Sequence, residues 1–376
     1  MSQIRHSAPL ILIVLTTVAV GCTEKGARIG AIVSETGELG IYGKEVKRGI
    51  ELAREQINAE GGFSGGPVEL VYRDDKSSPA VAEKEITELI DAEEIEVLIG
   101  GVSSDVMLAI APIAQQRKAV LMSPSASAPA ITDAGDFVFR NYPSDVLEGT
   151  SMADFAREQG LENIAIFSEA NKWGAGLTGV FRSRFESRRR NSQLFELSRD
   201  ADIAQMIANV KDMNPDGVYL VTYAEATNEI LPLLRAAGIH AVFMGTSSLR
   251  PQVIAELGDA ADKLVLTRPA FDGESEDERM RAFVEAYRKK YAGDPDIYSA
   301  HGYDALMLLW NAMKDGNSSD ADEVRRALYK IEGFQGAAGR TSFDDKGDVV
   351  RYPRLFVVQA GTTMPYADFK EQGGTL

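Results

Sequence analysis

The sequence predicts an α/β fold in which parallel strands alternate with helices, and residues 97–131 show this pattern most clearly. A short apolar run at 97–99 stops at two glycines, a helical pattern begins at Ser104, and a second apolar run follows at 120–122. This order corresponds to strand, loop, helix and strand. Two successive strands joined by a crossover helix are expected to lie parallel in one sheet.

Serines gather where these two strands are expected to end. Because the carboxyl ends of parallel strands meet at one edge of a sheet, we expect the hydroxyls to lie close together there. The helix N-terminus adds free N–H groups and partial positive charge, so this edge suits an anionic ligand group. Each serine taken alone could instead be a helix cap or a turn residue. The five serines are Ser103, Ser104, Ser123, Ser125 and Ser127.

A repeat in the sequence predicts two similar lobes. The strand and aromatic residue at 165–173 echo those at 31–42, and residues 230–244 then echo residues 110–122 in the same order. Two echoes in one order indicate two copies of a strand, loop and helix arrangement, with a ligand between them. We expect the matched aromatic residues of the first echo to wall that ligand site. They are Tyr42 and Trp173.

The other elements follow from apolar periodicity and from the residues at their ends. Gly61 and Gly62 end the first helix, and Pro79 starts the second. The first strands are expected at 29–33, 68–72, 97–99 and 120–122, with helices around 46–57, at 79–90 and from 104. The last third is expected to hold helices at 279–291, 300–313 and 321–331, a turn at 343–348 and a strand at 354–359.

The N-terminus has the pattern of an export signal. Arg5 precedes an apolar stretch that is too short to span a bilayer, and small residues stand just before Cys22. Cys22 is the only cysteine, so no intramolecular disulfide can form. The pattern resembles the lipobox of bacterial lipoproteins, with Ala19 where leucine is usual, and implies cleavage before Cys22 and lipidation of that residue. The alternative is an ordinary signal peptide with an incidental cysteine.

The formal net charge of −16 over 376 residues argues against nucleic acid or an anionic membrane surface as a partner. No later apolar run approaches ~20 residues, so we expect membrane contact through the lipid anchor only. The basic cluster at 182–190 is interpreted as a solvated helix end, and the alternative is a docking patch for a partner protein.

No catalytic, cofactor or metal motif is recognisable. Beyond the signal the histidines are His240 and His301, and neither lies in a metal or triad pattern. Residues 174–179 fit G-x-G-x-x-G, but the loop that separates them from the preceding strand is too wide for a pyrophosphate. We therefore expect no enzyme activity, no cofactor and no metal, although these observations leave Ser-Lys and paired-carboxylate chemistry open.

Five stretches of the chain are distinctive: residues 29–79, the Gly-Gly-Val-Ser-Ser loop at 100–104, the Ser-Pro-Ser-Ala-Ser loop at 123–127, residues 168–176 and residues 302–305. Together they resemble the leucine/isoleucine/valine-binding protein family, the type I solute-binding proteins of ABC importers. The resemblance runs from about residue 28 to residue 361.

This resemblance implies a type I periplasmic binding protein fold, in which two Rossmann-like lobes are joined by a three-segment hinge and close around the ligand. Crossovers are expected near Asn141, Pro269 and Thr341. The implied division is a signal peptide at 1–21, a first lobe at 28–141 and 270–340, and a second lobe at 142–269 and 341–376.

The resemblance also implies site residues. Serines hold the ligand carboxylate in the family, and they map onto Ser104, Ser125 and Ser127. The family's aromatic residues map onto Tyr42, Trp173, Tyr223 and Tyr298. The family has a carboxylate for the ligand ammonium where this chain has Ser247. Either Asp105 or Glu225 takes over that role, or the ligand carries no ammonium.

The leading hypothesis is therefore a lipid-anchored, non-enzymatic receptor at the periplasmic or cell-surface face. It delivers a small carboxylate-bearing solute, such as a branched-chain or other aliphatic amino acid, to ABC permease subunits. One alternative is a receptor of the same fold for another organic acid or an amide. An exported hydrolase or a dinucleotide-dependent enzyme is the alternative from a different class.

Overall fold

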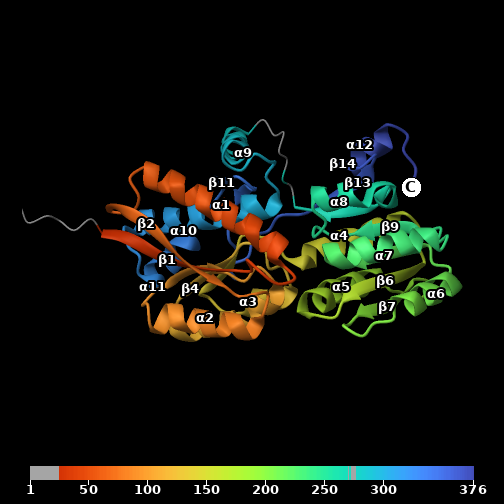
Figure 1. The fold of residues 1–376 in the computed structure, drawn as a ribbon, viewed down its shortest axis with the longest axis horizontal. Coiled ribbons are helices and arrows are strands. Elements are labelled where there is room, and N and C mark those ends of the chain that lie inside the picture. Colours follow the sequence, from red (N-terminus) through yellow and green to blue (C-terminus); the bar gives the residue numbers. More distant parts are fainter. Residues whose placement is uncertain (1–24, 270, 272–276) are drawn as a thin grey trace, which may run out of the picture.

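The computed structural model describes residues 25–269, 271 and 277–376. These residues form two α/β lobes that lie side by side (Figure 1). The predicted signal peptide at 1–21 and the predicted lipidation site, Cys22, lie outside the described residues. Within the described part of the chain, no helix combines the length and the apolar character needed to cross a membrane.

The first lobe is built on a sheet of five parallel strands, in the order β2 (Gly65–Asp74), β1 (Lys25–Val33), β3 (Val97–Gly100), β4 (Val120–Ser123) and β5 (Val138–Arg140). Strands β3, β4 and β5 are buried along their whole length, because helices cover both faces of the sheet. On one face lie α1 (Gly40–Ala59) and α10 (Ile297–Gly316), and on the other α2 (Pro79–Asp91) and α3 (Ser104–Arg117). A 3-10 turn at Pro129–Asp133 precedes β5.

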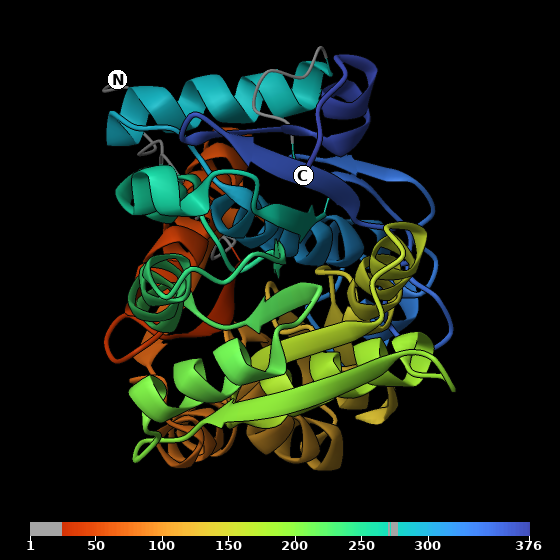
Figure 2. The ribbon, with the colours of Figure 1, turned by 90° about the vertical axis from the view of Figure 1, so that its right-hand side faces the viewer.

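The second lobe has a seven-stranded sheet in the order β14 (Thr362–Pro365), β13 (Arg354–Gln359), β10 (Val265–Arg268), β9 (Val242–Gly245), β8 (Gly217–Val221), β6 (Asn163–Glu169) and β7 (Asn191–Leu197). Figure 2 shows these strands rising from β7 near the bottom of the view to β13 near the top. Strands β13 and β14 are antiparallel to their neighbours, whereas the other five are parallel.

Helices cover both faces of this second sheet as well. The helices α4 (Asp145–Glu158) and α5 (Lys172–Phe185) pack on one face, and α6 (Ile203–Met213), α7 (Ala224–Ala236) and α8 (Pro251–Leu257) on the other. A 3-10 turn at Gly258–Ala261 follows α8. The remaining elements are α9 (Glu278–Tyr291), α11 (Ala321–Leu328), β11 (Phe334–Gly336), β12 (Gly339–Thr341) and α12 (Tyr366–Glu371).

The parallel strands of the two lobes follow the same connectivity. The order β2-β1-β3-β4-β5 in the first lobe corresponds to β7-β6-β8-β9-β10 in the second. The two-lobe α/β fold predicted from the sequence repeat is thereby confirmed. Both lobes also need a glycine where the first helix meets the end of its strand. A Cβ on Gly43 would lie 2.0 Å from the Ser34 oxygen, and one on Gly174 would lie 2.1 Å from the Glu169 oxygen.

The chain passes between the lobes after β5, after β10 and between β12 and β13. The predicted lobes were residues 28–141 with 270–340 and residues 142–269 with 341–376. We propose to move the last boundary to residue 351, because Asp348 and Arg351 are bound by residues of the first lobe. The first passage is held by Asn141, whose Nδ2 donates to the His301 oxygen in α10 at 2.9 Å. The third carries Asp348, whose carboxylate is bound by the buried Arg140 at the end of β5, with Nε to Oδ1 at 2.5 Å.

Candidate ligand-binding site

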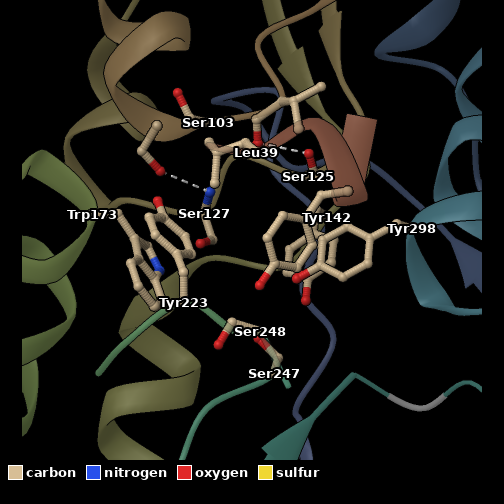
Figure 3. Close-up of a pocket in the computed structure, with 13 residues that line it drawn as sticks. Leu39, Ser103, Ser125, Ser127, Tyr142, Trp173, Tyr223, Ser247, Ser248 and Tyr298 are labelled. Carbon is tan, nitrogen blue, oxygen red and sulfur yellow. Dashed lines mark hydrogen bonds between the residues drawn. The ribbon is translucent and has the colours of Figure 1, made fainter. Parts of the chain in front are cut away.

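A cavity of about 40 Å³ lies between the lobes, at the carboxyl ends of strands from both sheets. Figure 3 shows serines of the first lobe on one side, Ser247 and Ser248 on the opposite side, and aromatic rings between them. This small space suits a small molecule rather than a polymer. The lining residues are Leu39, Tyr42, Val102, Ser103, Ser104, Ser125, Ser127, Tyr142, Trp173, Tyr223, Ser247, Ser248 and Tyr298.

The serine side of the cavity is organised around the N-terminus of α3. Ser103 is the N-cap, and its Oγ accepts from the Val106 N–H at 3.1 Å. Ser104 begins the helix, and its Oγ accepts from the N–H groups of Ser127 at 3.3 Å and Ala128 at 3.1 Å. Because the Ser104 oxygen is used as an acceptor, its proton is left to donate to a ligand. A hydroxyl donor at a helix N-terminus suits a carboxylate.

The loop after β4 completes this side. Ser125 Oγ donates to the Val102 oxygen at 2.8 Å, so Ser125 ties this loop to the loop that precedes α3 while lining the cavity. Ser127 makes the loop contacts with its backbone, since its carbonyl accepts from Arg140 Nη1 at 3.0 Å and from the Asp145 N–H at 2.9 Å. The backbone of Ser127 therefore holds the loop in place, and its hydroxyl lies beside the Asp145 carboxyl.

Aromatic rings form the side walls. The indole of Trp173 stacks on Tyr223, with ring centroids 4.6 Å apart and an interplanar angle of 16°. The rings of Tyr42 and Tyr298 meet edge to face at 4.9 Å, and Tyr142 stacks on Tyr298 at 6.3 Å. Buried ring pairs of this kind give the cavity flat apolar walls for a hydrocarbon or aromatic group.

Tyr42 and Trp173 lie in the first turns of α1 and α5, so α1 begins before the helix expected around 46–57. The position of Trp173 has a local cause. The side chain of Asn171 accepts from the Gly174 N–H at 2.8 Å and so caps α5 just before Trp173. Both rings are consequently held by helices and point between the lobes.

Hydrogen bonds close the cleft over the cavity. The Ala224 N–H at the start of α7 donates to Tyr42 Oη of the first lobe at 3.1 Å. The Lys172 N–H at the start of α5 donates to Asp105 Oδ1 at 3.1 Å. Because both bonds join helix N-termini of the second lobe to side chains of the first, the structure represents a closed arrangement of the lobes.

Ser247 lines the cavity from the second lobe, and a carboxylate lies directly behind it. Glu148 of α4 accepts from the Ser247 N–H at 3.0 Å, from Ser247 Oγ at 2.8 Å and from Thr267 Oγ1 at 2.8 Å. The Ser247 hydroxyl gives its proton to Glu148 and so turns a lone pair toward the cavity. This end of the cavity therefore accepts a hydrogen bond, with the charge of Glu148 directly behind it.

Two fully buried carboxyl groups, Asp145 and Glu148, lie one helical turn apart behind this wall. Burial raises the pKa of both, and the neighbouring Glu148 raises the pKa of Asp145 further. Glu148 accepts three hydrogen bonds, whereas Asp145 has beside it only the Ser127 hydroxyl, which lowers its pKa less than burial raises it. We therefore assign the negative charge of the pair to Glu148.

The structure brings together eight of the ten ligand-binding residues named from the sequence, namely Tyr42, Ser104, Ser125, Ser127, Trp173, Tyr223, Ser247 and Tyr298. Asp105 and Glu225 do not line the cavity. Asp105 is occupied with the Lys172 N–H, and Glu225 lies exposed in the first turn of α7, near Glu38 and Glu169. Neither stands where an enclosed ammonium would lie.

Among the residues that escaped the sequence analysis are two polar ones that line the cavity and one behind its wall. Tyr142 follows Asn141 at the first crossover, and Ser248 is the neighbour of Ser247, so their places in the sequence could have indicated them. Glu148 carried no such signal, because its contact with Ser247 joins residues far apart in the chain. No group of three metal-ligating side chains suited to a metal ion occurs among the residues described.

Residues 26–363 match the model of the family described as periplasmic binding protein. The chain belongs to the periplasmic binding protein family. This assignment confirms the predicted family and the expectation of a solute-binding protein without enzyme activity. The family assignment also fits the fold, since both lobes carry helices on each face of a largely parallel sheet.

Similar members of the periplasmic binding protein family bind amino acids. A leucine-, isoleucine-, valine-, threonine- and alanine-binding protein of Pseudomonas aeruginosa is 26% identical over 323 residues, which cover 84% of this chain and 85% of the relative. A leucine-binding protein of Thermotoga maritima is 28% identical with a TM-score of 0.84, over 90% of this chain and 97% of that one.

The fold alone does not decide the ligand within this family. A solute-binding protein from R. palustris, solved in complex with benzoate, is 23% identical and has a TM-score of 0.82 over 91% of this chain and 95% of that one. Its likeness to this chain concerns the fold.

Proposed function

We propose that this protein is the lipid-anchored receptor of an ABC importer and binds a small carboxylate-bearing solute between its lobes. The observation that carries the proposal is the inter-lobe cavity, which joins a serine-lined helix N-terminus to aromatic walls and a hydrogen-bond-accepting end. An export signal, a lone Cys22 and similarity to amino-acid-binding proteins support delivery of the solute to permease subunits from the periplasmic or cell-surface face.

The ligand carboxylate lies against the N-terminus of α3 in this proposal. Ser104 and Ser127 donate to it, and the partial positive charge of the helix end stabilises it. Trp173, Tyr223 and Tyr42 enclose the apolar part of the ligand. Closure of the lobes then removes both parts from water.

An amino acid is the ligand class that the second lobe favours. Its ammonium would donate to Ser247 Oγ, and the charge of Glu148 behind that hydroxyl would compensate the positive charge. Glu148 thereby takes the role for which the sequence offered Asp105 or Glu225.

A second candidate is a receptor for an organic acid or amide without an ammonium group. It is supported by the absence of a carboxylate from the cavity lining, since a neutral Ser247 also suits a hydroxyl or amide donor. Titration calorimetry with aliphatic amino acids and their 2-hydroxy and 2-oxo counterparts separates the candidates. Tighter binding of the amino acids supports the first, and tighter binding of the deaminated acids supports the second.

The same measurement tests the class of protein. Saturable binding with a stoichiometry of one and no turnover supports a receptor, whereas conversion of the bound compound contradicts it. For the anchor, Cys22→Ser should release the protein from the membrane fraction. A variant that still sediments with membranes as the wild type does would contradict the lipidation.

A further inference from the structure

A second and larger cavity, of about 580 Å³, adjoins the ligand cavity, and Ser247 lines both. It lies between α8, β10, β13 and β14 of the second lobe and α9 with the start of α10 of the first. Figure 1 places α8, α9, β13 and β14 along the upper edge of the molecule. The cavity is therefore bounded by both lobes, outside the serine and aromatic site already described.

Arginines dominate the charge of this second cavity. Two of the four have carboxylate partners, since Arg250 pairs with Asp296 at 2.6 Å and Arg288 with Asp294 at 2.6 Å. The other two, Arg268 and Arg354, form no ion pair with any described residue. Arg268 donates to the Leu249 oxygen at 2.5 Å and to Thr363 Oγ1 at 3.3 Å, both of which are neutral.

The sheet places these two arginines side by side. Strands β10 and β13 are antiparallel, and their register sets Arg268 directly opposite Arg354. Directly opposed residues of antiparallel strands project from the same face, and like charges in this position destabilise the pair of strands. Burial also lowers the pKa of Arg268 to about 10. An anion between the two guanidinium groups would relieve both costs.

We propose that the cavity beside Arg268 and Arg354 is an anion-binding site that takes a carboxylate or phosphate group. Two planar guanidinium groups on one face can each donate two hydrogen bonds to such a group. The formal net charge of −16 disfavours unspecific binding of anions elsewhere on the protein. A site for an anion on so acidic a chain therefore needs local concentration of positive charge, which these residues supply.

The anionic group comes from one of two sources. It is either the second acidic group of a ligand that extends past Ser247 from the first cavity, or a separate small anion. The first source rests on the function proposed above, because it requires a ligand in the serine-lined cavity. The second does not, since a separate anion would bind whether or not that cavity holds a carboxylate.

The test uses the full mature chain and titration calorimetry with inorganic phosphate and with α,ω-dicarboxylates, at constant ionic strength. Arg354→Gln is the main variant, because Arg354 is exposed and its loss leaves the core intact. Arg188→Gln, at an exposed position in the basic cluster 182–190, is the control with the same change of net charge. We expect Arg354→Gln to weaken binding of at least one probe tenfold or more, and Arg188→Gln to change it less than twofold.

Ser127→Ala distinguishes the two sources. Dicarboxylate binding that is weakened by both Ser127→Ala and Arg354→Gln supports an extended ligand. Phosphate binding that depends on Arg354 but not on Ser127 supports a separate anion, and it would stand even if no carboxylate bound in the first cavity. Equal affinities of wild type and Arg354→Gln for every probe overturn the anion site.

Melting temperatures distinguish an anion site from a purely structural role of Arg268 and Arg354. Without an anion, Arg354→Gln should melt at or above the temperature of the wild type, because a repulsive contact has been removed. Phosphate or the dicarboxylate that binds should raise the melting temperature of the wild type more than that of the variant. A lower melting temperature of the variant, with no difference in the response to anions, contradicts the site.

Discussion

Arg250 of the second lobe forms an ion pair with Asp296 of the first, with Nε 2.6 Å from Asp296 Oδ2. Its guanidinium also reaches Glu45 Oε1 at 3.2 Å and the Ile41 oxygen at 3.1 Å, both in α1 of the first lobe. The side chain of Arg250 is only 12% exposed. One residue at the start of α8 thus binds two helices of the opposite lobe.

Arg250→Gln should therefore favour the open arrangement of the lobes. Glu45 keeps Arg48 as a partner and Asp296 continues to cap α10, so the first lobe should remain folded. We expect ligand affinity to fall by about 1–3 kcal/mol, the scale of hydrogen bonds to charged groups. Calorimetry measures the affinity and small-angle scattering the dimensions. A variant that stays as compact as the wild type and binds the ligand equally well would show that Arg250 does not hold the lobes closed.

Ser127→Ala should weaken binding of a carboxylate ligand by about 1–3 kcal/mol, because a charged group loses a donor. The thermal stability of the ligand-free protein should change little, since Ser127 holds the loop through its backbone. Ser104→Ala should lower both the ligand affinity and the thermal stability, because Ser104 Oγ also accepts from two backbone N–H groups. Ser183→Ala, at an exposed position of α5, is the control. If Ser127→Ala and Ser104→Ala both bind the ligand as tightly as the wild type, these serines do not contact the ligand.

Trp173 should report the closing of the lobes. It stacks on Tyr223 at the cavity, whereas Trp310 is buried in the first lobe, where its Nε1 donates to the Gly62 oxygen at 3.0 Å. Ligand should change the fluorescence of the wild type and of Trp310→Phe, but not that of Trp173→Phe. A ligand-dependent signal that survives in Trp173→Phe places the moving contact elsewhere.

Glu148→Gln should discriminate between ligand classes. The variant removes the charge behind Ser247, so we expect affinity for amino acids to fall tenfold or more and affinity for the 2-hydroxy acids to change much less. The 2-hydroxy acids serve as the internal control for any distortion of the wall. Ser247→Asp, which places a carboxylate in the cavity lining, should raise the preference for amino acids. An unchanged preference in both variants argues that the ligand presents no ammonium to this wall.

Closure should weaken as pH rises through neutrality. Burial, together with the nearby carboxylates of Glu38 and Glu225, raises the pKa of Glu169 to about 7. Glu38 belongs to the first lobe and Glu169 to the second, so opening separates these groups. A carboxyl whose pKa is higher in the closed state favours closure below that pKa and opposes it above, once the group ionises.

Ligand affinity should accordingly fall between about pH 6 and pH 8, and Glu169→Gln should flatten this dependence. The amide oxygen of glutamine can still accept from the Tyr223 N–H, which Glu169 binds at 2.9 Å. Glu158→Gln, in a helix away from the cleft, is the control for net charge. A pH profile that is the same in the wild type and Glu169→Gln would exclude this group as the cause.

The sequence predicted the fold well because its signals are local. An apolar run such as 120–122 indicates a strand of a few consecutive residues. The echo between residues 31–42 and 165–173 likewise compares two short segments, each of which forms a strand and the start of a helix. The gathering of Ser104, Ser125 and Ser127 followed from the same reasoning, since adjacent parallel strands end at one edge. Much of the site could therefore be predicted from the loops that follow adjacent strands.

Contacts between distant segments were beyond such reasoning. Glu148 was not predicted as a partner of Ser247, because only the packing of α4 against the loop after β9 brings them together. Asp105 was named for its position near the cleft, but a backbone N–H at the start of α5 occupies it. Which carboxylate faces an enclosed ligand depends on such packing, and no local pattern encodes it.

The third passage between the lobes has a consequence for how the molecule bends. Asp348 is bound by Arg140, and Arg351 donates to the Ala338 and Arg340 oxygens, so the chain remains fixed to the first lobe as far as Arg351. Tyr352 and Pro353 are the residues left before β13 begins. The segment free to pivot on this side of the molecule is therefore about two residues long and adjoins the second sheet, so we expect the second lobe to turn as one body about a short axis.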